Sequence, residues 1–149
     1  MAQLENLYRE VIMDHYKNPR NKGLINQSSY STIHLKNPTC GDDITIQSQV
    51  DHDTIQDCRF EGHGCSICCA SASILTETMI GKSCADAKQL ANQYLNMVRN
   101  QPYDESIDLE EAAVFSGIRQ FPARTKCASI AWMAFLDTLD KEETPCPQK

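Results

Sequence analysis

The chain has 149 residues, of which 41% are hydrophobic and 23% charged, with a formal net charge of −6. A chain of this length can bury roughly two thirds of its unfolded surface, so we expect residues 1–149 to fold as a single domain without disulfide support. The acidic balance provides no global positive field, which argues against nucleic acid or an anionic membrane as a partner.

Two features indicate the compartment. The segment Met1–Glu10 contains acidic residues and no apolar run of signal-peptide length, and no stretch of about 18 apolar residues occurs in the chain. We therefore expect a cytoplasmic protein. The eight cysteines would then lie in a reducing compartment, where clustered thiols more often serve metal or sulfur chemistry than disulfides.

The first half of the chain predicts one helix and then strands. An amphipathic helix is expected to end before Pro19, because apolar residues recur upstream at helical spacing: Leu4, Leu7, Tyr8, Val11 and Ile12. The loop that follows carries Arg20 and Lys22, a small basic patch that either contacts a partner or is simply solvated. Between Tyr30 and Phe60 the apolar period changes to two, which predicts three short strands. Asp51–Asp53 is a tight-turn signal, so the second and third strands are expected to be antiparallel.

The second half of the chain predicts helices. Ser66 is the expected N-cap of a helix that ends before Gly81, and Ser83 resembles the start of a capping box for a helix through about Arg99. A short helix is expected over Asp108–Phe115, ended by Gly117. The last helix is expected to begin near Thr125 with one apolar stripe, formed by Ala128, Ala131, Trp132, Phe135 and Leu139. The polar tail, residues 141–149, is expected to be disordered. Strands followed by helices predict an α+β fold with a small three-stranded antiparallel sheet packed against helices.

Three cysteines are placed where the chain changes direction. Cys40 lies in a predicted turn, Cys65 at a predicted helix start, and Cys127 in the predicted first turn of the last helix. The exposed amides of a helix start favour a thiolate, so Cys65 and Cys127 are expected to have lowered pKa values. With the carboxylate of Asp42, the three thiols suit a tetrahedral Zn²⁺ ion whose shell can be partly opened.

The remaining cysteines have plainer interpretations. Cys58, Cys68, Cys69 and Cys84 are expected to pack in the interior, and Cys146 to be idle in the tail. His63 is a spare ligand or a solvated side chain. Cys65 and Cys68 also form a C-x-x-C motif typical of dithiol redox sites. A predicted hairpin precedes that motif instead of a βαβ unit, and a redox site would leave Cys40 and Cys127 unexplained.

Four ordered motifs resemble the IscU/NifU N-terminal-like family of iron–sulfur assembly proteins, and within it the SufU-type branch: Leu7–Asn21, Asn37–Asp42, Phe60–Ser73 and Lys126–Cys127. The resemblance implies a SufE/NifU-like α/β sandwich and a metal site of Cys40, Asp42, Cys65 and Cys127. It also implies a PLP-dependent cysteine desulfurase of the SufS type as partner, and downstream iron–sulfur assembly proteins. Scaffold-type members carry a histidine immediately before the third cysteine, where this chain has Lys126, and a shorter stretch between the second and third cysteines. Both departures favour the zinc-binding sulfurtransferase branch.

The resemblance leaves several functions open. In the first, an enzymatic one, Cys40 leaves Zn²⁺ when a partner's ligand replaces it and accepts persulfide sulfur, while Asp42, Cys65 and Cys127 keep the ion. In the second, the chain is a non-enzymatic scaffold that binds iron and assembles a transient [2Fe–2S] cluster on the same residues. A structural zinc domain without a transfer role is the third.

Overall fold

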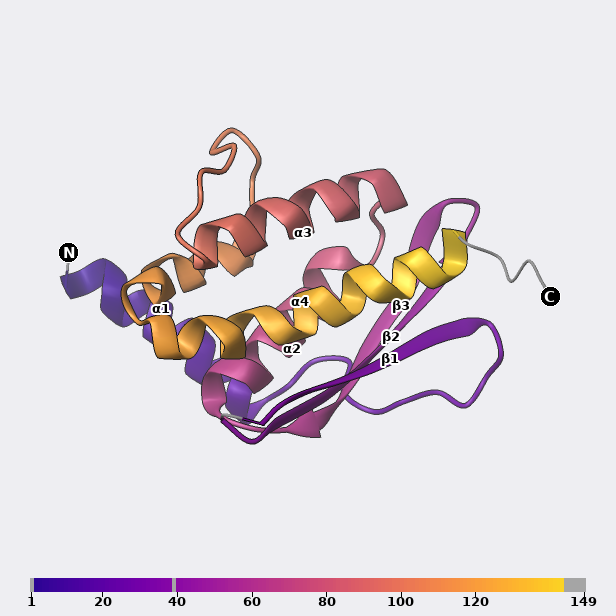
Figure 1. Cartoon of the computed structure of the whole chain (residues 1–149), viewed down its shortest axis with the longest axis horizontal. Helices are drawn as coiled ribbons and strands as arrows, with labels where there is room; N and C mark the ends of the chain where they lie inside the picture. The colour runs from indigo at the N-terminus through magenta and orange to yellow at the C-terminus, as the bar shows by residue number, and fades with distance from the viewer. Residues whose placement is uncertain (1, 39, 144–149) are drawn as a thin grey trace.

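A computed structural model describes residues 2–38 and 40–143, and its elements confirm the predicted α+β fold. Three strands form one antiparallel sheet in the order β1–β2–β3. Helices α2 and α4 pack on this sheet, and α3 packs on α4 (Figure 1). The elements in chain order are α1 (Ala2–Lys17), β1 (Tyr30–Asn37), β2 (Asp42–Asp51), β3 (Thr54–His63), α2 (Ser66–Met79), α3 (Cys84–Val98), the 3₁₀ helix η1 (Glu110–Gln120) and α4 (Pro122–Glu143).

Two turns fix the ends of the sheet. The β2–β3 hairpin pairs Asp51 with Thr54, and its two turn residues His52 and Asp53 have φ values of 53° and 62°. Positive φ at both central residues is the signature of a type I′ turn, which matches the twist of the flanking strands. At the opposite end, Asn37 of β1 pairs with Asp42 of β2. The β1–β2 connection therefore places Cys40 at the end of the sheet opposite the β2–β3 turn.

The core lies between the sheet and the helices. Ile44 and Ile46 of β2 are fully buried, and the predicted apolar stripe of α4 is also buried throughout. The buried hydroxyl of Ser48 donates to Thr138 Oγ1 of α4 at 2.7 Å, so this polar pair is satisfied inside the core. Over the described residues, no helix combines the length and apolar character that crossing a bilayer requires.

Helices α1, α2 and η1 are joined by one buried histidine. His15 is 1% exposed, with Nδ1 2.7 Å from Ser73 Oγ and Nε2 2.6 Å from Glu111 Oε1. The backbone N–H of Arg20 donates to the same Ser73 Oγ at 2.9 Å, and its guanidinium pairs with Asp14 at 2.8 Å. Arg20 is therefore held by its own protein, which weakens the interpretation of the basic loop as a partner contact.

Three expected boundaries were wrong. The N-cap of α2 is Cys65, not Ser66. Helix α4 begins at Pro122, three positions before Thr125, because proline suits the first position of a helix. The short helix is a 3₁₀ helix that continues past Gly117, which is not among the residues with positive φ. The start of the tail, expected at residue 141, was wrong as well, because α4 continues to Glu143. Residues 144–149, including Cys146, lie outside the described residues.

Candidate metal centre

Three of the four predicted site residues, Cys40, Asp42 and Cys127, converge at one end of the sheet. The ligand atoms of Cys40, Asp42 and Cys127 lie within 4.8 Å of one another. Cys65 adjoins this group, because its backbone N–H donates to Asp42 Oδ1 at 3.1 Å and its side chain contributes to raising the pKa of the Cys127 thiol. Cys40 is exposed and Cys65 partly buried, whereas Asp42 and Cys127 are buried. The cluster thus has one exposed sulfur, that of Cys40, one partly exposed sulfur, that of Cys65, and two buried ligand side chains.

Asp42 is held in place from two sides at the start of β2. Its Oδ1 accepts the Cys65 N–H, and Asn37 Nδ2 donates to its Oδ2 at 3.4 Å. Gly64, with φ +156°, makes room for this carboxylate, since a Cβ there would lie 2.3 Å from Asp42 Oδ1. Asp42 is 2% exposed, and no described Lys or Arg forms an ion pair with it. A carboxylate buried this way is stabilised by a cation nearby.

Cys65 occupies the N-cap position of α2. Its φ and ψ of −71° and 167° are extended, and its Sγ accepts the backbone N–H of Cys68 at 3.4 Å. The helix start therefore directs a backbone donor and the positive end of its dipole at this sulfur.

Cys127 does not have the environment that the sequence predicted. Because α4 begins at Pro122, Cys127 lies in the second turn of the helix and not in the first. Burial, followed by hydrogen bonds with Asp42, Cys40 and Cys65, raises the pKa of the Cys127 thiol. A cation at the centre would reverse this balance, because bound metal ions deprotonate the thiols that coordinate them.

The helix that carries Cys127 is anchored at the next residue. The backbone carbonyl of Ala128 accepts hydrogen bonds from Ser71 Oγ at 2.9 Å and from the Tyr94 hydroxyl at 2.8 Å. Trp132 donates its indole N–H to Ser71 at 2.9 Å and stacks on Tyr94 with ring centroids 3.9 Å apart. This buried network from α2 and α3 fixes the position of α4 beside the site.

The residues present fit Zn²⁺. Three thiols and one carboxylate provide four ligands of the types that zinc accepts, at about 2.3 Å for sulfur and about 2.0–2.2 Å for oxygen. Four such ligands around one ion lie a few ångströms apart, which agrees with the 4.8 Å limit within which Cys40, Asp42 and Cys127 already meet.

A second group of ligand-type side chains lies beside the positively charged Arg20. His15, Glu77 and Glu111 place their ligand atoms within 4.8 Å of one another. The guanidinium of Arg20 lies 4.0 Å from Glu77, and His15 is hydrogen-bonded at both ring nitrogens. We therefore interpret this group as a link between helices.

The cysteines outside the site are placed largely as predicted. Cys58, Cys68 and Cys84 are buried, and burial raises the pKa of the Cys58 and Cys68 thiols. Cys69 is only partly buried, contrary to expectation, and its thiol donates to the carbonyl of Gly64 at 3.8 Å. His63 is exposed, which agrees with a solvated side chain. No two of the described cysteines form a disulfide.

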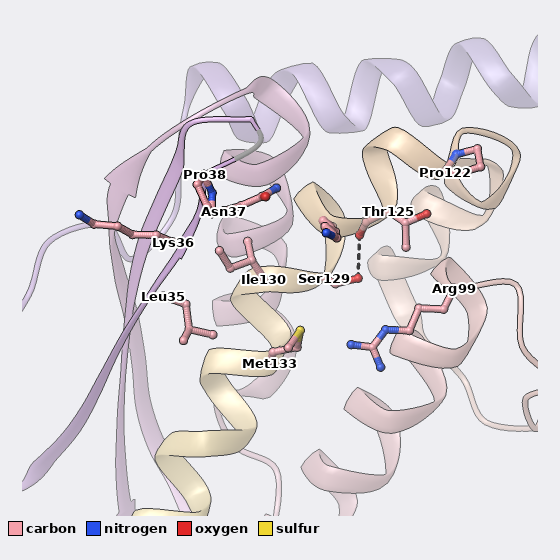
Figure 2. A pocket seen from close by; sticks show the side chains of 11 residues that line it. Leu35, Lys36, Asn37, Pro38, Arg99, Pro122, Thr125, Ser129, Ile130 and Met133 are labelled. Atoms are coloured by element: carbon pink, nitrogen blue, oxygen red, sulfur yellow. Dashed lines mark hydrogen bonds between the residues drawn. The ribbon is translucent and has the colours of Figure 1, made fainter.

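A groove that the sequence did not reveal lies beside the site, between β1 and α4 (Figure 2). Its volume is about 750 Å³, and three cations line it: Lys36, Arg99 and Lys126. Asn37 lines the same groove and donates to Asp42, so the groove and the site share a wall. No sequence signal could indicate this groove, because its walls come from segments that only the tertiary fold brings together.

Comparison with known proteins gives one family. The family model described as "NifU-like N terminal domain" matches residues 7–128. The chain is 46% identical over 95% of both chains to "Zinc-dependent sulfurtransferase SufU" of Bacillus subtilis (strain 168). It is 37% identical to "Iron-sulfur cluster assembly scaffold protein IscU" of Streptococcus pyogenes, over 95% of this chain and 87% of that protein. The crystal structure of a putative iron–sulfur cluster assembly scaffold protein for the SUF system from Fervidobacterium islandicum is similar with a TM-score of 0.74 and 32% identity, covering 86% of this chain and 93% of that one.

Proposed function

Since the chain belongs to the NifU-like N terminal domain family, we propose that it serves iron–sulfur cluster assembly as a zinc-dependent sulfurtransferase. The observation that carries the proposal is the convergence of Cys40, Asp42 and Cys127, with Cys65 beside them, at one edge of the sheet. The similarity to SufU over nearly the whole chain supports the same activity. The metal ligands are Cys40, Asp42, Cys65 and Cys127, and the resident ion is Zn²⁺.

Cys40 is the sulfur acceptor because it is the exposed thiol of the cluster. Zinc bound here would store the acceptor sulfur as a thiolate between reactions. The Cys40 thiolate attacks the outer sulfur of a persulfide on the donor protein. A new S–S bond forms on Cys40, the S–S bond of the donor breaks, and the donor's own thiolate leaves.

The neighbours of Cys40 keep the rest of the site in place during this exchange. Asp42 stays bound to the Cys65 N–H, and Cys127 stays on the anchored part of α4. Only Cys40 lies on a turn, where a change of position disturbs no helix or strand. Its thiol makes a long contact, 4.0 Å, to the carbonyl of Ala123 at the start of α4.

The sulfur donor is a PLP-dependent cysteine desulfurase of the SufS type. The basic groove beside the site supports such a protein partner, because Lys36, Arg99 and Lys126 offer positive charge on a chain whose net charge is −6. Downstream iron–sulfur assembly proteins receive the sulfur.

The test is substitution of Cys40. Substitution of another cysteine, Cys58, is the control. Cys40→Ala is expected to abolish formation of a persulfide on this chain when a cysteine desulfurase and cysteine are supplied, while part of the zinc remains bound. Cys58→Ala removes a fully buried thiol of β3 and should leave both properties unchanged. Persulfide is measured by mass spectrometry and zinc by elemental analysis. Full sulfur acceptance by Cys40→Ala would refute the assignment.

The similarity to IscU scaffold proteins supports a second candidate function. In it, the same thiols ligate iron and the chain carries a transient [2Fe–2S] cluster. Anaerobic reconstitution with iron and sulfide distinguishes the two functions. A stable visible chromophore with stoichiometric sulfide favours the scaffold, whereas a colourless protein that retains zinc favours the sulfurtransferase.

A further inference from the structure

We propose that Cys65 and Cys68 form a peroxide-sensitive dithiol, and that their disulfide reversibly takes the site out of use. Cys65 is a proposed metal ligand, but sulfur transfer as described above does not use the pair of thiols in this C-x-x-C motif. Cys68 lies outside the set of four proposed ligands, so its thiol is available for a separate reaction.

The helix start brings the two residues together. The Sγ of Cys65 already accepts the backbone N–H of Cys68 at 3.4 Å, so the Cys65 side chain lies against the turn that carries Cys68. Residues three positions apart at a helix start have Cα atoms about 5 Å apart. Disulfides span Cα separations of about 4.4–6.8 Å, so rotation of the side chains can close the bond without moving the backbone.

The two thiols differ in solvent exposure. This suits a pair in which one cysteine is oxidised first and the other, the resolving cysteine, then forms the disulfide with it. Cys65 is partly exposed, while Cys68 is fully buried beneath it. Of these two thiols, a peroxide therefore reaches Cys65 before Cys68, and Cys68 reacts with the oxidised sulfur next to it. Accessible thiolates next to a second thiol are the usual targets of reversible oxidation.

The chemistry balances with a hydroperoxide as the oxidant. The Cys65 thiolate attacks one peroxide oxygen, the O–O bond breaks, and Cys65 becomes a sulfenic acid, while the other oxygen leaves as hydroxide or alkoxide and takes a proton from the solvent. The Cys68 thiol then attacks the Cys65 sulfur, an S–S bond forms, and the hydroxyl leaves as water with the thiol's proton. The two cysteines lose two electrons and the peroxide gains them.

Other thiols near Cys65 are less suited to this reaction. Cys127 contacts Cys65 from a different helix, but it belongs to the four proposed ligands, so in the zinc-loaded protein its thiol is held by the ion. The thiol of Cys69 points to the carbonyl of Gly64 at 3.8 Å. Cys68 is the partner whose backbone is already bound to the Cys65 sulfur.

The consequence for the metal rests on the proposed function. A disulfide sulfur is a poor ligand compared with a thiolate, so oxidation removes Cys65 from the ligand set. We expect zinc release and loss of sulfur acceptance at Cys40, both restored by a thiol reductant. The disulfide also protects Cys65 from irreversible oxidation to sulfinic and sulfonic acids.

The experiment treats the full-length, zinc-loaded protein with about one equivalent of hydrogen peroxide and blocks the remaining thiols with an alkylating agent. Fragmentation mass spectrometry of the unreduced peptides then locates the disulfide, and a zinc indicator follows release of the ion. Wild type is expected to yield the Cys65–Cys68 disulfide and to recover its zinc binding after reduction and zinc addition.

Two matched variants test the resolving role. Cys68→Ser, with Cys68→Ala as a second variant if the hydroxyl disturbs the core, should instead accumulate sulfinic or sulfonic acid at Cys65 and fail to recover. Cys69→Ser should behave as wild type. A disulfide from Cys65 to Cys69 or Cys127 in wild type would overturn the proposal, as would recovery of both Cys68 variants. If wild type binds no zinc but still forms the Cys65–Cys68 bond, the proposed function fails while the dithiol stands.

Discussion

The space left by Gly64 gives the sharpest test of how the site is built. A methyl group at this position would place its carbon 2.3 Å from Asp42 Oδ1 and 3.1 Å from Asp42 Cα, so Gly64→Ala must displace the carboxylate or the backbone. The φ of +156° adds strain, since L residues rarely adopt it. Strain of this kind costs about 1–3 kcal/mol. Loss of the charged hydrogen bond from the Cys65 N–H to Asp42 costs about 1.5–3 kcal/mol more.

Gly64→Ala is therefore expected to lower the free energy of unfolding by about 2.5–6 kcal/mol, out of a total of about 5–15 kcal/mol for a typical domain. For a chain of this length the corresponding fall in Tm is at least about 5 °C. Urea and thermal denaturation of the metal-free protein measure the stability, and zinc titration with a chelating indicator measures the weakened site.

Two other glycines separate the causes. Gly117→Ala meets no described atom within 4 Å at an ordinary φ, so it should be nearly neutral. Gly41→Ala also meets no described atom within 4 Å but has φ +74°, so it should show the strain without the clash. If Gly64→Ala is as stable as Gly117→Ala and binds zinc as tightly as wild type, the account of the Asp42 pocket is wrong.

Three further predictions concern the framework around the site. Ser71→Ala leaves the indole N–H of Trp132 without its acceptor, so it should lower the free energy of unfolding, measured by urea denaturation, by about 1–3 kcal/mol. A decrease of less than about 0.5 kcal/mol would contradict the anchoring role of this network. His15→Ala removes the contacts to Ser73 and Glu111 and opens a cavity, so it should lower the free energy of unfolding by about 2–4 kcal/mol. It should also speed hydrogen exchange in α1 and η1. Unchanged exchange in these helices would show that His15 does not join them. Desolvation is the main reason why the pKa of Tyr30 rises from 10.0 to about 12, and the hydrogen bond to Asp57 and the charge of Asp57 add to it. The contribution of Tyr30 to stability is therefore complete below about pH 10 and is lost as the pH rises to about 12. Tyr30→Phe should abolish this alkaline decline, and an identical decline in both proteins would assign it to other groups.

The sequence predicts the fold well where one period dominates. Alternation in the strands, the turn residues at Asp51–Asp53 and the apolar stripe of α4 each depend on local spacing, and the structure confirms them. The N-cap of α2 was missed because serine is the commoner cap, whereas Cys65 takes the position with a sulfur acceptor. The start of α4 could have been found from Pro122, a residue that favours the first helical turn.

The sequence predicted which residues form the site, but not the packing that brings them together or the burial of each side chain. Convergence of Cys40, Asp42 and Cys127 follows from the pairing of Asn37 with Asp42 and from the packing of α4 on the sheet, neither of which a local pattern reveals. The environment of Cys127 could not be predicted, because its burial depends on contacts with distant segments. The same is true of the basic groove and of the access of Cys40.

The dispersal of the site along the chain sets the order in which it matures during synthesis. A ribosome delivers the turn of Cys40 and the start of α2 long before α4, which carries Cys127. Until α4 emerges, the nascent chain exposes Cys40 and Cys65 without the third cysteine and without the helix that packs beside them. We therefore expect the proposed metal to be loaded only after α4 has been synthesised.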